Sequence, residues 1–113
     1  MKKFIARAAT TLLVIAAAAQ PAMAGTETYL VSANDTDWIS LRVCGPSALA
    51  VRGDGDTDLD FTVFNSSGRI VHVDDDLTDI TFARLRPAGQ CEGFRLKVEN
   101  LGPVGNIYSV SLD

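Results

Sequence analysis

The sequence G-D-G-D-T-D-L-D-F, residues 53–61, joins a turn rich in glycine and aspartate to the start of an alternating apolar segment. Leu59 and Phe61 begin a period of two that continues to Val63, with polar residues between them. This period is typical of a β-strand that buries one face. The stretch therefore predicts that the chain turns over residues 53–58 and enters a strand at Leu59.

The same alternation recurs on both sides of this stretch, and no part of the chain after residue 24 shows a sustained 3.6-residue apolar period. Turn residues separate the apolar segments at the spacing typical of all-β domains. The predicted strands are Glu27–Val31, Trp38–Val43, Ala48–Gly53, Leu59–Phe64, Ile70–Asp74, Ile80–Leu85, Gly93–Asn100 and Asn106–Leu112. Short strands with one apolar face each must bury these faces against a second sheet. The sequence thus predicts an all-β fold, an antiparallel β-sandwich of about eight strands.

The first 24 residues have the organisation of a secretory signal peptide. The positive start, the apolar run and the small-x-small cleavage site lie, in this order, at Lys2–Arg7, Ala8–Ala19 and Ala22–Ala24. The apolar run is shorter than the about 20 residues that a transmembrane helix needs, so an uncleaved anchor is the weaker interpretation. We expect cleavage after Ala24, a single domain over residues 25–113, and a periplasmic or secreted protein.

Removal of residues 1–24 makes the chain strongly acidic. The segment carries three of the ten basic residues and none of the 14 acidic ones, which leaves seven basic residues and a net charge of −7. Nucleic acid and anionic membrane surfaces both attract basic patches. The composition therefore argues against nucleic acid as a partner, and against association with a membrane once the signal peptide is removed.

The two cysteines, Cys44 and Cys91, allow a single intramolecular pairing. Disulfides persist in the oxidising compartments to which export leads. A redox pair is disfavoured because the C-x-x-C spacing is missing, and a zinc site is disfavoured because two cysteines and one distant histidine supply too few ligands. A structural disulfide is the favoured interpretation, and by chain entropy its loop of about 47 residues would add roughly 4 kcal/mol of stability.

Two acidic segments supply candidate calcium ligands, because calcium binds six to eight oxygen atoms, mostly from carboxylates and carbonyls. The candidates are Asp54, Asp56, Asp58, Asp60, Asp74, Asp75 and Asp76. An EF-hand is excluded, since a loop starting at Asp54 has Leu59 where glycine is required and Asn65 where glutamate is required. The alternative is structural: aspartate side chains in turns cap backbone N–H groups, and the remaining charge is solvated. Capping is favoured over a metal site.

Two unique side chains are further candidates. His72 lies in an alternating segment without a nucleophile motif nearby, so it is interpreted as a surface or half-buried strand histidine rather than a general base. Trp38 falls out of phase with Ile39 and Leu41. It either packs at the edge of the core or stands exposed as a binding platform. Packing at the core edge is favoured because an indole buries a large apolar area.

Five pieces of the sequence follow one another in a familiar order and spacing. They are G-D-G-D-T-D-L-D-F at 53–61, T-V-F-N-S-S-G-R-I-V at 62–71, D-D-D-L-T-D at 74–79, F-R-L-K-V-E-N-L-G at 94–102 and G-N-I-Y-S-V at 105–110. Over about Ala50 to Leu112 the chain thereby resembles a bacterial pre-peptidase C-terminal (PPC) domain. The resemblance implies a small jelly-roll-like β-sandwich that is not catalytic. Some members of that family bind calcium, and others bind collagen or polysaccharide.

The exposed aromatic residues that binding members use are not obvious in this sequence. Phe61, Phe82, Phe94 and Tyr108 all stand at core-like positions of the alternating pattern. We therefore expect an exported module without enzymatic activity, which binds or assists a protein or a polysaccharide. The alternative is a calcium-dependent structural module without a separate ligand. The sequence specifies neither the partner nor an oligomeric state.

Overall fold

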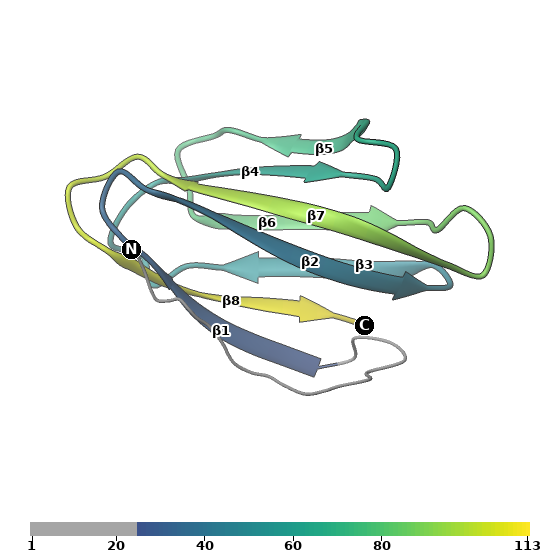
Figure 1. Ribbon diagram of the computed structural model, residues 1–113. Helices are drawn as coiled ribbons and strands as arrows, with labels where there is room; N and C mark the ends of the chain where they lie inside the picture. The colour runs from purple at the N-terminus through teal and green to yellow at the C-terminus, as the bar shows by residue number, and fades with distance from the viewer. Residues whose placement is uncertain (1–24) are drawn as a thin grey trace.

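The computed structural model describes residues 25–113, and the predicted signal peptide lies outside the described residues (Figure 1). The strands are β1 Gly25–Val31, β2 Thr36–Cys44, β3 Ser47–Arg52, β4 Leu59–Phe64, β5 Ile70–Asp74, β6 Ile80–Leu85, β7 Cys91–Asn100 and β8 Asn106–Leu112. All eight predicted strands are confirmed. The bounds of β4, β5, β6 and β8 are those predicted, and the other four differ by one or two residues at one end or at both.

The strands form two four-stranded antiparallel sheets that face each other. One sheet has the order β1-β8-β3-β6 and the other has the order β2-β7-β4-β5 (Figure 1). Strands pair β1 with β8, β2 with β7, β3 with β6 and β4 with β5. The chain is thus one long hairpin, turned back between β4 and β5 and then rolled so that successive pairs enter opposite sheets. This is the arrangement of a jelly roll, and the predicted fold class is confirmed.

The roll requires a sharp corner where the chain passes from one sheet to the other. Only Gly45 and Pro46 separate β2 from β3, which belong to different sheets. Gly45 has a φ of 85°, a conformation that other residues rarely adopt, and the hydroxyl of Ser47 donates a hydrogen bond to the Gly45 carbonyl (3.0 Å). Glycine at this position therefore lets β2 and β3 lie in different layers.

The core lies between the sheets and is made by the inward half of each alternating strand. Its largest fully buried side chains include Phe61, Leu49, Leu96 and Tyr108. The Tyr108 hydroxyl donates a hydrogen bond to the Asp37 carboxylate (2.6 Å), so its polar atom is satisfied inside the sandwich. The pKa of Tyr108 is raised, first by burial and then by the neighbouring Asp37 charge.

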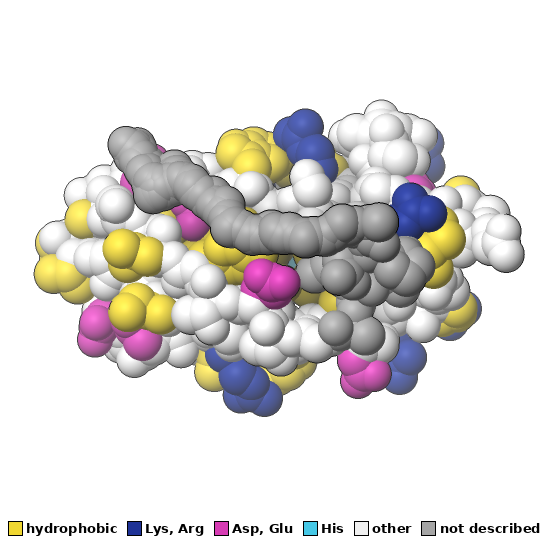
Figure 2. Space-filling view, turned by 60° about the horizontal axis from the view of Figure 1, so that its bottom comes forward, with side chains coloured by type: hydrophobic (Ala, Val, Ile, Leu, Met, Phe, Trp, Pro, Cys, Tyr) yellow, Lys and Arg dark blue, Asp and Glu magenta, His cyan; other side chains and the backbone are white. Residues whose placement is uncertain are grey.

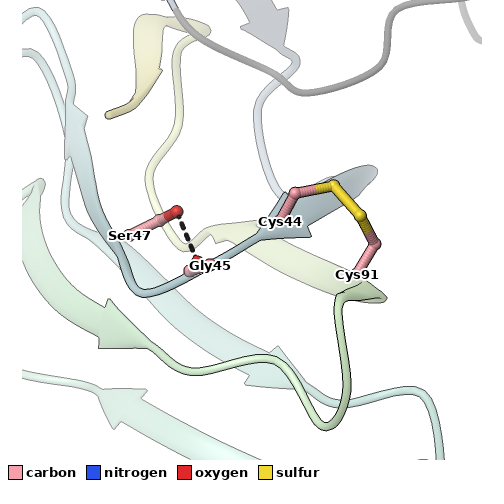
Figure 3. Close-up of a disulfide and its surroundings, with 4 residues drawn as sticks. All are labelled: Cys44, Gly45, Ser47 and Cys91. Carbon is pink, nitrogen blue, oxygen red and sulfur yellow. Dashed lines mark hydrogen bonds between the residues drawn. A yellow bond between two sulfur atoms is a disulfide. The ribbon is translucent and has the colours of Figure 1, made fainter.

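Cys44 and Cys91 form a disulfide with an S–S distance of 2.09 Å, as predicted (Figure 3). The two residues are direct partners in the β2–β7 register, with Cα atoms 4.1 Å apart. The bond therefore ties together the two arms of the long hairpin. A disulfide here is consistent with a location outside the cytoplasm.

The two ends of the sandwich differ in charge. The aspartate-rich turns, β3–β4 and β5–β6, lie at the left end in Figure 1, whereas the β4–β5 turn and the disulfide-linked ends of β2 and β7 lie at the right end. The molecule measures 40 × 29 × 22 Å. In residues 25–113 we find no helix of the length and apolarity that a membrane span needs.

Candidate binding groove

The outer face of the β2-β7-β4-β5 sheet brings together aromatic and basic side chains from three strands. Ser40, Arg95 and Phe64 form one cross-strand row of β2, β7 and β4. In the next row Trp38 pairs with Lys97. Because side chains in a strand alternate between faces, these residues all point away from the core that Ile39 and Leu41 enter.

Trp38 is exposed on this face, which corrects the interpretation that it packs at the core edge. Its side chain is 49% exposed. The indole contacts Phe64, with ring centroids 5.7 Å apart, and the Arg95 guanidinium carbon lies 4.4 Å from the indole centroid. The phase of the strand, and not the size of the indole, decides where Trp38 lies. Ile39 and Leu41 face the core, so Trp38, one residue out of phase, faces away from it.

An open groove of about 750 Å³ runs beside Trp38. Its volume falls in the range of small-molecule ligand sites, about 300–1,000 Å³. Residues that line it include Trp38, Ser40, Arg42, Phe64, Gly93 and Arg95, together with the loop at Asn65–Gly68. We call it the Trp38 groove. A Cβ built on Gly93 would meet no atom within 4 Å, so the space above this part of the groove is open.

The loop wall of the Trp38 groove is held by side chain–backbone hydrogen bonds. The side-chain amide oxygen of Asn65 (Oδ1) accepts from the backbone N–H groups of Ser67 (3.0 Å) and Arg69 (2.9 Å). The Glu92 carboxylate accepts from the hydroxyl (2.6 Å) and the N–H (3.0 Å) of Ser66, and from the N–H of Ala88 (2.7 Å). These donors, the Ser66 hydroxyl first, lower the pKa of Glu92. They anchor the loop and offset the one carboxylate that borders the groove wall.

The groove face carries a large share of the positive charge of residues 25–113. Arg42, Arg95 and Lys97, which lie on this face, are three of the seven basic residues after residue 24. Lys97 forms an exposed ion pair with Glu99 (3.7 Å). Arg95 has no ion pair with any carboxylate in the described part of the chain, and its cation lies over Trp38. The groove therefore offers an aromatic surface beside a positive charge that lacks a carboxylate partner.

The aspartates lie mainly at the opposite end of the sandwich, and some of them cap turns as the sequence predicts. The Asp54 carboxylate accepts from the N–H groups of Ile107 (2.9 Å) and Asp56 (3.0 Å). The Asp76 carboxylate accepts from the N–H (2.9 Å) and the hydroxyl (2.7 Å) of Thr78. These hydrogen bonds lower the pKa of Asp54, with Ile107 as the main cause, and the pKa of Asp76, with the Thr78 hydroxyl as the main cause.

Asp60 is the aspartate whose carboxylate interacts with the charges of several other carboxylates. It lies on β4 directly opposite Glu99 of β7. Its pKa is raised, first by desolvation and then by the charges of Glu99, Asp75, Asp58 and Asp74. Even so, within residues 25–113 no three His, Cys, Asp or Glu side chains come together in a group that could hold a metal ion. The candidate calcium ligands around Asp60 are thus close enough for their charges to interact, but they do not form a coordination site in the described residues.

A buried polar network, which sequence reasoning missed, holds the aspartate-rich turn. Asp79 is 8% exposed, and its carboxylate accepts from the Gly55 N–H (2.7 Å) and the Asn106 amide (3.1 Å). Asn106, with 0% exposure, also donates to Thr57 and accepts from the Asp54 N–H (3.1 Å). A Cβ at Gly53 would clash with Asp79 and Asn106. The only sequence signal is an asparagine at the first position of β8, which is a weak one.

His72 is half-buried, as predicted, and its Nε2 lies 2.8 Å from the Thr81 hydroxyl. Thr81 belongs to β6, so this contact joins the edge strands of the two sheets. Because Thr81 is 1% exposed, its hydroxyl is out of reach of a substrate. The pair therefore links the sheets rather than offering a nucleophile and a base.

Phe82 was predicted at a core-like position, and this prediction is wrong. Its side chain is 59% exposed on the outer face of β6, with the Arg52 cation 5.2 Å from its ring centroid. On the side of β1 and β8, which comes forward in Figure 2, the visible hydrophobic side chains lie in separate small groups. Phe82 and Arg52 thus form an aromatic–cation pair on the sheet opposite the Trp38 groove, which makes them a matched control for it.

No protein-family model and no curated protein matches this chain. The resemblance to PPC domains therefore rests on the sequence pieces themselves.

Proposed function

We propose that this protein is an exported, non-catalytic β-sandwich module that binds a protein or polysaccharide through the Trp38 groove. The observation that carries the proposal is an exposed indole beside Phe64 and Arg95, at the rim of an open groove. Aromatic residues and arginine are enriched where proteins bind partners, because they combine large apolar area with polar contacts. The resemblance to PPC domains, some of which bind polymers, points in the same direction.

The chemistry of the remaining residues supports a role without catalysis. The single histidine contacts a buried threonine, and the aspartate-rich turns β3–β4 and β5–β6 lie at the end of the sandwich away from the groove. General acid–base chemistry needs a proton donor and a proton acceptor facing one reacting group. Export is supported by the features of residues 1–24 and agrees with the disulfide.

Trp38→Ala is expected to weaken binding by roughly tenfold or more, because a central aromatic anchor carries much of the energy of an interface. The free energy of unfolding should change by only about 1 kcal/mol, since the indole is half-exposed and its lost contacts are with Phe64 and Arg95. The measurement is co-sedimentation of the protein, produced from the full chain, with insoluble polysaccharides and with candidate exported proteins. Emission of Trp38, the single tryptophan, reports ligand entry directly.

Phe82→Ala is the matched control, because it removes an exposed aromatic residue that also contacts an arginine but lies on the other sheet. It should retain full binding. Equal binding by wild type and Trp38→Ala, or equal losses in the two variants, would contradict a binding role for the groove.

The second candidate function is a calcium-dependent structural module, and the crowding of carboxylates around Asp60 favours it. Asp60→Asn separates the two functions by the sign of its effect. If calcium binds there, calcium raises the melting temperature of the wild type, and the variant loses this gain. Without calcium, the variant should be the more stable one, because it removes repulsion from Glu99 and the neighbouring aspartates.

The same repulsion makes the effect of Asp60 on the stability of the fold depend on pH. Because the pKa of Asp60 is raised in the folded protein, its ionisation destabilises the fold as the pH rises from the ordinary aspartate value through the raised one. The stabilisation by Asp60→Asn should therefore be largest at neutral pH and vanish in acid. Thermal unfolding of the wild type and the variant with calcium and with chelator, at neutral and at acid pH, measures this stabilisation. Superimposable wild-type curves with and without calcium would exclude the calcium-dependent module.

A further inference from the structure

The Trp38 groove differs in charge from the rest of the protein, and this difference indicates its ligand. We propose that the groove binds an acidic polysaccharide, with Arg95 holding a sugar carboxylate and the Trp38 indole holding the sugar ring beside it. This inference rests on the proposed binding function and names the ligand class.

Arg95 is placed to bind a carboxylate. Its guanidinium lies over the Trp38 ring, and within residues 25–113 it forms no ion pair. A guanidinium held over an aromatic ring keeps its N–H donors in its own plane, where they match the two oxygens of a carboxylate. The stacking also orders the side chain before the ligand arrives, which reduces the entropic cost of binding. Lys97, whose ammonium lies 5.7 Å from the same indole centroid, is paired with Glu99, so Arg95 is the cation that the ligand meets.

The net negative charge of the mature chain does not prevent this binding, because the aspartate-rich end is distant from the groove. Asp60 and Phe64 are four residues apart on β4, which is about 13 Å along an extended strand. The Debye length is about 10 Å at 0.1 M salt, so the acidic end is largely screened from a ligand in the groove. Glu92, which is nearer, directs its carboxylate at the Ser66 and Ala88 donors.

The form of the groove favours a sugar chain over an acidic peptide. Extended peptides commonly gain affinity by adding a strand to a sheet edge, where backbone groups are unpaired. The Trp38 groove lies instead on the face of the sheet, over the edge strand β2 and the inner strands β7 and β4. Its surfaces are an aromatic ring, a cation and the open space above Gly93. Pyranose rings, which present flat C–H faces and carry their carboxylates at the rim, suit these surfaces.

The test uses polygalacturonate, its neutral methyl ester and poly-L-glutamate as probes, with Trp38 emission and calorimetry as readouts. We expect polygalacturonate to bind, with an affinity that falls as salt is added, and the methyl ester and polyglutamate to bind at least about tenfold more weakly. Arg95→Gln should lower the affinity for polygalacturonate by roughly tenfold to a hundredfold, as loss of a hydrogen bond between charged groups does. Arg52→Gln, the matched cation on the other sheet, should leave it unchanged.

Gly93→Val tests the site without removing a charge. A side chain there enters open space and suits a strand, so the fold should be retained while the groove is narrowed and polygalacturonate binding lost. Ala48→Val, on the exposed outer face of β3, is its control. Equal binding of the methyl ester, or tighter binding of polyglutamate, overturns this inference and leaves the proposed binding function standing. Absence of any change in Trp38 emission with all three probes overturns the acidic-polysaccharide inference alone, and the proposed function is then decided by the Trp38→Ala comparison.

Discussion

Replacement of both cysteines, by Cys44→Ala together with Cys91→Ala, is expected to lower the free energy of unfolding by about 4 kcal/mol. The bond closes a loop with a sequence separation of 47 residues, and its removal restores the conformational freedom of that loop to the unfolded chain. For a small domain this is a large share of the net stability. The variant should therefore unfold at a much lower temperature, or fail to accumulate as folded protein.

Urea unfolding of the oxidised wild type, the reduced wild type and the double variant measures this effect. The reduced wild type and the double variant should agree, since both lack the cross-link. Ser47→Ala is the local control: it removes the hydrogen bond to Gly45 at the adjoining corner and should cost about 1 kcal/mol. Coincident unfolding curves for oxidised and reduced wild type would refute a stabilising role for the disulfide.

The disulfide also has a consequence for the groove. Cys44 and Cys91 form the cross-strand pair next to Arg42 and Gly93 on the same outer face, because residues two apart in a strand share a face. The bond thus fixes the spacing of β2 and β7 at one end of the Trp38 groove. Reduction is expected to weaken ligand binding even in conditions where the protein stays folded.

Asn106→Leu is expected to be the second strongly destabilising change, at roughly 3 kcal/mol or more. Asn106 is fully buried, and its amide donates to Asp79 and Thr57 and accepts from the Asp54 N–H. A leucine leaves the Asp54 N–H and the Thr57 oxygen without this partner and leaves the Asp79 carboxylate only the Gly55 N–H, and each unsatisfied buried polar group costs about 1–3 kcal/mol.

Thermal and urea unfolding compare this variant with Asn65→Ala. Asn65 also uses its amide oxygen to accept two backbone N–H groups, but in an exposed turn, so its loss should cost about 1 kcal/mol. Asn106→Asp is a third variant for this comparison. It puts a second carboxylate beside Asp79, and the repulsion between the two carboxylates disfavours their ionisation. Its destabilisation should ease as the pH falls and the pair becomes protonated. Equal effects of the buried and the exposed asparagine substitutions would contradict the network.

The sequence by itself determined the local features. Alternation of apolar and polar residues places all eight strands, because a strand with one buried face must repeat every two residues. The capping by Asp54 and Asp76 is also local, since each carboxylate accepts from an N–H two residues ahead. The disulfide could be predicted from the presence of two cysteines and from the expected oxidising compartment alone.

The tertiary structure decided which face of a strand is buried when both faces carry apolar residues. In β6, Thr81 and Leu85 turn inward and Phe82 outward, because antiparallel pairing sets Thr81 opposite the buried Val51 of β3. The sequence pattern alone favours the reverse, since Ile80 and Phe82 are the larger apolar side chains. Register with a partner strand fixes the phase, and that partner is distant along the chain.

The groove and the polar network were likewise decided by the tertiary structure alone. Trp38, Phe64 and Arg95 come from three strands that meet only in the rolled sheet. Asp79 lies in the turn between β5 and β6 and Asn106 at the start of β8, and the two meet at the acidic end. A periodic pattern describes one strand at a time, whereas these sites depend on which strands lie side by side, and that choice is made when the two sheets bury their apolar faces together.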